Sequence, residues 1–60
     1  MHSNQPYLLN REQAAHFLGI DPKSFDRYFR AQPDFKRFRL GRHDRFTISA
    51  IKEFIEQNYV

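Results

Sequence analysis

Hydrophobic positions recur along the chain with two different periods, and the changes of period mark its predicted elements. In three stretches apolar residues lie three or four positions apart, as on one face of an amphipathic helix. Between the second and the third stretch, apolar and charged residues alternate, which is typical of strands. The predicted elements are a helix from about Arg11 to Leu18, a helix from Pro22 to about Ala31, a β-hairpin within residues 35–46, and a helix after Thr47.

Each predicted helix begins with a capping residue, and an apolar residue precedes the cap. The caps are Asn10, Asp21 and Thr47, and Gly19 supplies the stop of the first helix. Only residues 19–21 separate the first two helices, and so short a link containing glycine is typical of a helix-turn-helix. We expect the core to receive Ala14, Phe17 and Leu18 from the first helix, Phe25, Phe29 and part of Tyr28 from the second, and Ile51, Phe54 and Ile55 from the third.

The register of the hairpin follows from the rule that directly opposed residues share a face. A two-residue turn at Arg42 and His43 would mix apolar and charged residues on both faces, so we expect a three-residue loop of Gly41, Arg42 and His43. The expected register pairs Phe38 with Phe46 and Leu40 with Asp44 on the inner face, and Arg39 with Arg45 and Arg37 with Thr47 on the outer face.

The residues before the first helix, 7–9, are either a short strand or an extended lead-in to this helix, with Leu40 as a packing partner.

Composition bounds the class of protein. Sixty residues make one domain, and 17% aromatic residues can build a compact core in few positions. The chain has no cysteine, which excludes disulfides and thiolate metal sites. No apolar run is long enough to span a bilayer and no signal peptide is visible, so we expect a cytoplasmic protein that does not contact membranes.

Charge indicates the partner. The net charge is +3, and half of all Lys and Arg residues lie within residues 35–46, where Asp44 is the single acid. Ordinary solvated charges would explain any one of these residues. A second cationic stripe favours DNA, because Lys23, Arg27 and Arg30 line up on the outer face of the second helix with no facing acid and with Asp26 at the edge of this face. The candidate major-groove residues of that helix are Lys23, Ser24, Arg27, Tyr28 and Arg30, with Arg30 best placed for phosphate. The candidate hairpin contacts are Arg37, Arg39, Arg42, His43 and Arg45.

Other chemistry finds no support in the sequence. His2, His16 and His43 do not have the spacing of metal ligands, and no nucleophile motif or phosphate-binding glycine loop is present. Glu53 and Glu56 lie three residues apart on a predicted exposed face, where solvated charges are the simplest reading. We therefore expect no cofactor, no metal and no enzyme activity.

The order of these parts resembles a known family. The segments NREQAAHFLGIDPKSFDRYF and FRLGRHDRFTISAIKEFI are similar to the small excisionase-type winged helix-turn-helix domain, whose core also occurs at the N-terminus of MerR-type regulators. The resemblance extends from Leu8 to Ile55. It implies an α+β fold with three helices and a β-hairpin wing between the second and third. This chain departs from the pattern at Tyr28 and Phe29, which leaves open whether Tyr28 belongs to the core or contacts DNA.

The resemblance also implies a role. Excisionases of this kind bind and bend double-stranded DNA at the ends of an integrated phage or mobile element, and they help a tyrosine-family integrase to excise it. Cooperative self-association on DNA would fit such a role, as would a nucleoid location in a bacterial host. A MerR-type regulator would normally add a coiled coil and an effector domain, so the sequence favours an excisionase over a transcriptional regulator. A protein-interaction module with incidental charge is the third hypothesis.

Overall fold

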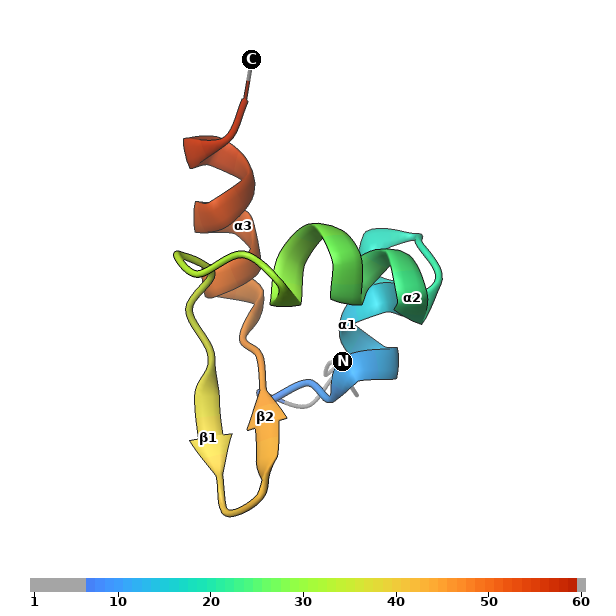
Figure 1. Cartoon of the computed structure of the whole chain (residues 1–60), viewed down its shortest axis with the longest axis vertical. Coiled ribbons are helices and arrows are strands. Elements are labelled where there is room, and N and C mark those ends of the chain that lie inside the picture. Colours follow the sequence, from blue (N-terminus) through green and yellow to red (C-terminus); the bar gives the residue numbers. More distant parts are fainter. Residues whose placement is uncertain (1–6, 60) are drawn as a thin grey trace, which may run out of the picture.

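The structure is a computed structural model that describes residues 7–59. It is an α+β fold of three helices, the second of which is partly π-helical, and a two-stranded antiparallel hairpin, as the sequence predicts. Figure 1 shows the hairpin projecting away from the helices, with α3 on one side of the molecule and α1 and α2 on the other. The elements are α1 (Arg11–Leu18), α2 (Pro22–Phe25), the π-helical segment η1 (Asp26–Arg30), β1 (Phe38–Leu40), β2 (His43–Arg45) and α3 (Ile48–Gln57).

The predicted helix starts are confirmed. Asn10 and Gln13 form a complete capping box at α1, and Gly19 ends this helix in the left-handed conformation, with φ of 76°. The Asp21 carboxylate and the Thr47 hydroxyl each accept a hydrogen bond from a backbone N–H of the first turn that follows. These caps satisfy backbone donors that would otherwise lack partners, which explains why the elements begin where the sequence places them.

The second helix differs from the expected α-helix in its C-terminal half. It is α-helical from Pro22 to Phe25 and π-helical from Asp26 to Arg30, and the Ala31 N–H donates to the Asp26 carbonyl over 2.9 Å. A π segment needs more residues per turn, so it turns the side chains that follow away from the expected α-helical positions. The prediction that Arg30 continues an exposed cationic stripe with no facing acid is therefore wrong, because Arg30 faces Asp26 and Asp44.

Phenylalanines build the core. Phe25 is fully buried, and its ring centroid lies 5.0 Å from that of Phe46 and 6.0 Å from that of Phe35, both in edge-on contacts. Such geometry suits the aromatic quadrupole and fills much volume with few residues. Phe35, to which the sequence analysis assigned no role, is therefore a central core residue. The buried residues are Leu9, Ala14, Ala15, Phe25, Phe35, Phe46, Ile51 and Phe54.

One expected core residue of α1 lies outside. Phe17 is exposed, and Ala15 takes its place beside Ala14 in the buried cluster. Two adjacent alanines let the backbone of α1 approach its neighbours closely, so the face centred on them turns inward. Tyr28 is 58% exposed, so the prediction that part of it belongs to the core is wrong.

The predicted hairpin register is wrong. Phe38 pairs with Arg45, Arg39 with Asp44 and Leu40 with His43, so the loop consists of Gly41 and Arg42 alone. Gly41 has φ of 62°, whereas no non-glycine residue among residues 7–59 has a positive φ. This is the φ sign pattern of a type II′ turn, whose twist suits the two strands of a hairpin. Arg39 and Arg45 are consequently not opposed to each other.

The new register reverses most of the expected inner face. Phe38 is 53% exposed and Leu40 is 48% exposed, whereas Arg39 pairs with Asp44 on the side that faces the helices. The sequence reasoning assumed that every apolar residue of the hairpin reaches the core. Because the hairpin projects away from the helices (Figure 1), Phe46 at its base does so, whereas Phe38 and Leu40 do not.

The N-terminal segment joins the base of the hairpin. Leu9 forms an isolated antiparallel bridge with Phe46, with N–H to carbonyl distances of 2.7 Å and 2.9 Å. The strand-like alternative for residues 7–9 is thus confirmed at Leu9 alone, and its partner is Phe46 rather than Leu40. This bridge ties the start of α1 to the residue that precedes the cap of α3.

Candidate nucleic-acid interface

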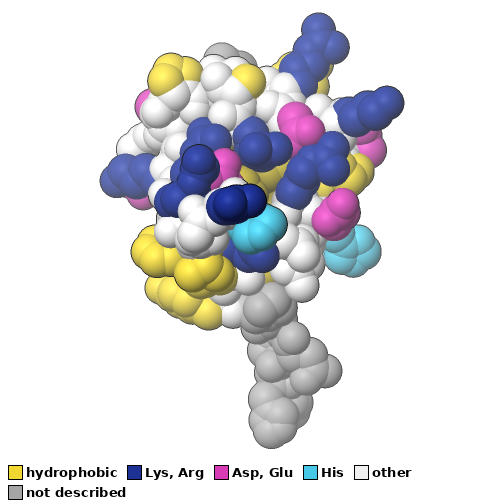
Figure 2. Space-filling model, turned by 60° about the horizontal axis from the view of Figure 1, so that its bottom comes forward, with side chains coloured by type: hydrophobic (Ala, Val, Ile, Leu, Met, Phe, Trp, Pro, Cys, Tyr) yellow, Lys and Arg dark blue, Asp and Glu magenta, His cyan; other side chains and the backbone are white. Residues whose placement is uncertain are grey.

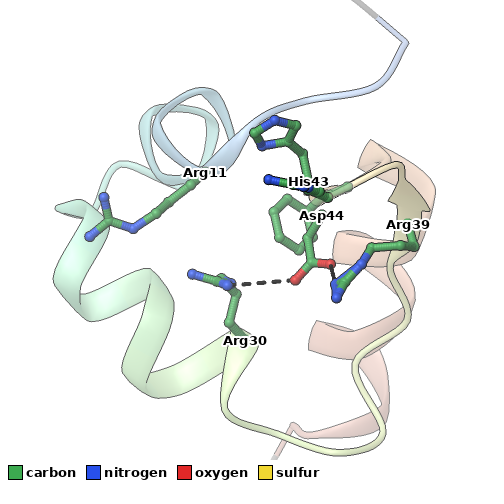
Figure 3. Close-up of a pocket in the computed structure, with 7 residues that line it drawn as sticks. Arg11, Arg30, Arg39, His43 and Asp44 are labelled. Atoms are coloured by element: carbon green, nitrogen blue, oxygen red, sulfur yellow. Dashed lines mark hydrogen bonds and ion pairs between the residues drawn. The ribbon is translucent and has the colours of Figure 1, made fainter.

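A basic groove lies between the hairpin and the helices. It has a volume of about 410 Å³, and Figure 3 shows side chains from α1, η1 and both strands converging on it. Four of its lining residues are arginines and one is an acid, so an anion is the ligand that its chemistry favours. The residues that line this basic groove are Arg11, Arg30, Arg39, Arg42, His43, Asp44 and Phe46.

Asp44 is the centre of the groove's charge network. Its side chain is only 13% exposed, and its carboxylate accepts a hydrogen bond from Nη1 of Arg39 over 2.8 Å. Arg30 and Arg37 also pair with it, at 3.5 Å and 3.8 Å. Figure 3 shows the carboxylate between the guanidinium groups of Arg30 and Arg39, a position in which a phosphate oxygen would find the same donors.

A second acid joins α1 to the second helix. Nε of Arg11 donates to both carboxylate oxygens of Asp26, at 2.9 Å and 3.0 Å, and Arg30 pairs with the same carboxylate at 3.1 Å. The hydrogen bond from Arg11, together with Arg30, lowers the pKa of Asp26 and keeps it charged. Arg30 thus bridges Asp26 and Asp44, which connects both helices to the hairpin through one chain of ion pairs.

Most candidate residues of the second helix are exposed, but two already have structural partners. Lys23 and Arg27 are exposed, and the Arg27 guanidinium lies 5.6 Å from the centre of the Tyr28 ring. The Ser24 hydroxyl donates to the Asp21 carboxylate over 2.6 Å, which lowers the pKa of Asp21. Ser24 therefore supports the helix start, and Arg30 belongs to the ion-pair chain. Lys23, Arg27 and Tyr28 remain as the free contact surface of this helix.

The candidate residues of the hairpin also divide into two groups. Arg37 donates to the carbonyl of Arg30 over 2.8 Å and lies against the Phe35 ring at 5.8 Å, so it holds the end of η1 to the base of the hairpin. Arg39 pairs with Asp44. Arg42 and His43 are exposed at the tip, and Arg45 is half-buried, with Nη1 donating to the backbone carbonyl of Asp44.

The surface view shows how these charges are distributed. In Figure 2 basic side chains gather on the face that carries the hairpin tip, with acidic side chains between some of them and a hydrophobic patch beside them. Within residues 7–59 half of the Lys and Arg side chains have no acidic side chain within ion-pair distance. These are Lys23, Arg27, Arg42, Arg45 and Lys52.

Sequence reasoning missed Arg11 and Asp26 as members of the site. Arg11 was read only as the start of a helix, and Asp26 as the edge of a cationic face. The spacing of Asp26 and Arg30, four residues apart, could have indicated their pairing. The contact between Arg11 and Asp26 joins two helices and is visible only in the fold.

Neither a metal centre nor a membrane span is found in the part of the chain that the structure describes. No cluster of three potential metal-ligating side chains occurs within residues 7–59, and no helix there is long and apolar enough to cross a bilayer. His2 lies outside the described residues. No protein-family model, no curated protein and no solved structure matches this chain.

Proposed function

We propose that this chain binds double-stranded DNA sequence-specifically through a winged helix-turn-helix surface. The observation that carries the proposal is the basic groove, in which arginines from two helices and a projecting hairpin converge. DNA presents a regular row of phosphates, and a protein that neutralises several of them at once gains affinity through the release of counterions.

The two cationic elements have different tasks in this proposal. The helix formed by α2 and η1 enters the major groove, where Arg27 contacts base edges and Lys23 contacts an adjacent edge or phosphate. Tyr28 supports Arg27 through their cation–π contact. The hairpin acts as the wing, and Arg42 at its exposed tip reaches the neighbouring minor groove or the phosphates beside it. Asp44 in the groove and Asp26 beside it are already paired with arginines and hold the two elements in position.

Within this class we propose an architectural role, that of an excisionase which binds and bends attachment-site DNA for a tyrosine-family integrase. Support comes from the resemblance of residues 8–55 to the excisionase-type domain and from the two cationic elements, the second helix and the hairpin. The alternative is a small transcriptional regulator of the MerR-like type that uses the same contacts. The protein itself would be no enzyme and would need no cofactor.

An electrophoretic shift series on the flanking genomic DNA and on random duplexes tests the proposal. Log affinity should fall linearly with log salt concentration, with a slope of about 0.9 per neutralised phosphate. Binding confined to attachment sites, with excision that depends on the protein, supports the architectural role. Promoter occupancy with a change in transcript level supports the regulator instead. No binding to any duplex at low salt would contradict both and favour a protein-interaction module.

Single substitutions separate the two contact elements. Arg27→Ala should lower affinity for the preferred site by about tenfold while affecting random DNA less, because one bidentate base contact contributes about 1–3 kcal/mol. Arg42→Ala should weaken binding to all sequences and reduce the salt slope by about one phosphate. Lys52→Ala is the matched control, since it removes an exposed cation of α3 that does not line the basic groove. Equal losses on specific and random DNA for Arg27→Ala would contradict this division.

A further inference from the structure

The hairpin carries two apolar side chains that the core does not use. Phe38 and Leu40 lie two residues apart on β1, so their side chains point to the same side of the strand. They are 53% and 48% exposed, whereas all the remaining phenylalanines of residues 25–54 belong to the hydrophobic cluster or pack against it. Exposed apolar side chains that are adjacent in space mark an interaction surface more often than isolated ones do.

The residues paired with them are basic, and none is acidic. His43 is opposite Leu40 and Arg45 is opposite Phe38, whereas the single acid of the strands, Asp44, belongs to the other face with Arg39. One face of the hairpin therefore combines two apolar side chains with Arg45 and His43, and the other holds the ion pair of Arg39 and Asp44. A polyanion with an apolar interior complements the first face in charge and in polarity.

Position along the hairpin distinguishes the two apolar residues. Leu40 directly precedes the Gly41–Arg42 loop, so it lies at the tip end of β1, two residues before the free cation Arg42. Phe38 lies nearer the base, where it lines a shallow hollow of about 260 Å³ together with Lys36 and Glu53. Glu53 pairs with Lys36 at 3.8 Å, so its charge there is compensated. Leu40 can advance furthest into a groove, while Phe38 can contact the groove wall behind it.

We propose that Leu40 is a wedge that enters the DNA minor groove next to Arg42 and partly unstacks one base step, while Phe38 packs against the sugar behind it. This inference rests on the proposed DNA-binding function and adds how the duplex is deformed. Apolar side chains inserted from the minor groove kink DNA by roughly 20–90°, and cations beside them hold the phosphates of the opened groove. Pyrimidine–purine steps such as TpA unstack most easily, so the protein selects sites that contain one in an A·T-rich segment.

The test uses the full chain and two duplexes of about 25 base pairs. One contains a central TpA step in an A·T-rich segment, and the other has a G·C centre without a pyrimidine–purine step. 2-Aminopurine placed at the central step reports unstacking, and a dye pair on the ends reports bending. The wild-type protein should raise 2-aminopurine fluorescence and shorten the end-to-end distance on the first duplex, which it should prefer by about tenfold.

Leu40→Ala should abolish the fluorescence rise and most of the bend, and it should lower affinity for the TpA duplex about fivefold to tenfold. Leu40→Met should retain the bend, because it keeps an apolar side chain of similar volume. Tyr59→Ala is the matched control, since it removes another large exposed hydrophobic side chain, far along the chain from the hairpin. Thermal unfolding of each variant verifies that the fold is intact.

Three results would overturn the inference. If Leu40→Ala binds and bends the TpA duplex as the wild type does, Leu40 is no wedge, although the proposed function stands. If Phe38→Ala and Leu40→Ala instead convert a dimer to a monomer in the absence of DNA, the face binds a second copy of the chain. If the wild-type protein shifts neither duplex at low salt, the proposed function fails and the wedge fails with it.

Discussion

Replacement of Asp44 by Asn should make the protein less stable and at the same time increase its affinity for DNA. The substitution keeps the size of the side chain and removes its charge. In the folded protein this carboxylate pairs with Arg39 at 2.8 Å, Arg30 at 3.5 Å and Arg37 at 3.8 Å. The same three guanidinium groups are candidate phosphate ligands, so the acid stabilises the free protein and competes with the ligand.

The loss of stability can be bounded from the exposure of the partners. Exposed ion pairs contribute about 0.2–1 kcal/mol each, whereas removal of one partner from a fully buried pair costs about 3–5 kcal/mol. Asp44 is 13% exposed, but its partners are between 27% and 66% exposed. We therefore expect a loss of about 1–2 kcal/mol in the free energy of unfolding. For a domain of this size that lowers Tm by about 4–16 °C.

The gain in affinity follows from Coulomb's law. A phosphate bound to Arg39 would lie on the order of 7 Å from the Asp44 carboxylate, and two like charges at this separation repel each other by about 0.6 kcal/mol in water and about 2.4 kcal/mol at an effective dielectric constant of 20. Removing this repulsion should strengthen binding to any duplex about threefold to fiftyfold. The gain should shrink as salt concentration rises, because the interaction is then screened.

Two assays with one control decide the matter. Circular dichroism follows thermal unfolding, and fluorescence anisotropy of a labelled random duplex follows binding, well below the melting temperature of the variant. Asp34→Asn is the control, because it raises the net charge equally from an exposed position that does not line the basic groove. If Asp44→Asn binds no tighter than Asp34→Asn, the groove is not where phosphates bind. Unchanged stability would show instead that the ion-pair network contributes nothing to the fold.

Three further predictions concern the elements that hold the interface. Arg11 and Arg30 lower the pKa of Asp26 in the folded state, so the stabilising effect of this carboxylate is fully present above its ordinary pKa of 3.8 and is lost as the pH falls through the lower folded-state value. Asp26→Asn should therefore flatten this part of the acid-unfolding curve. An unchanged curve would contradict the pairing of Asp26 with the two arginines. Gly41→Ala should destabilise the hairpin by about 1–2 kcal/mol through backbone strain alone, since φ is 62° and a new Cβ meets no atom within 4 Å. Gly41→Asn should be better tolerated, because asparagine adopts positive φ more readily than alanine. Equal unfolding free energies for both variants would refute the strain argument. Asn10→Ala should cost about 1 kcal/mol in chemical denaturation by removing the capping box, and a loss below a few tenths would show that the box is dispensable.

The helices were predictable because local chemistry determines them. Caps at Asn10, Asp21 and Thr47 and the stop at Gly19 satisfy or end backbone hydrogen bonding within a few residues, so α1 and the start of each helix follow from short sequence windows. The stripe of Ile51, Phe54 and Ile55 was likewise correct, because the long regular face of α3 has one way to bury itself.

The hairpin was not predictable in the same way, because its faces depend on where it stands. Alternation shows that Phe38 and Leu40 share a face, but only the tertiary structure decides whether the core or the solvent receives that face. Here Phe46 reaches the core whereas Phe38 and Leu40 do not, and the ion pairs of Asp44 with arginines from η1 and the hairpin support the observed register. The sequence by itself therefore determined three capped helices, a charged hairpin and a small α+β class. The tertiary structure decided which hairpin face is free, because burial and ion pairing between distant segments exist only after the chain has folded.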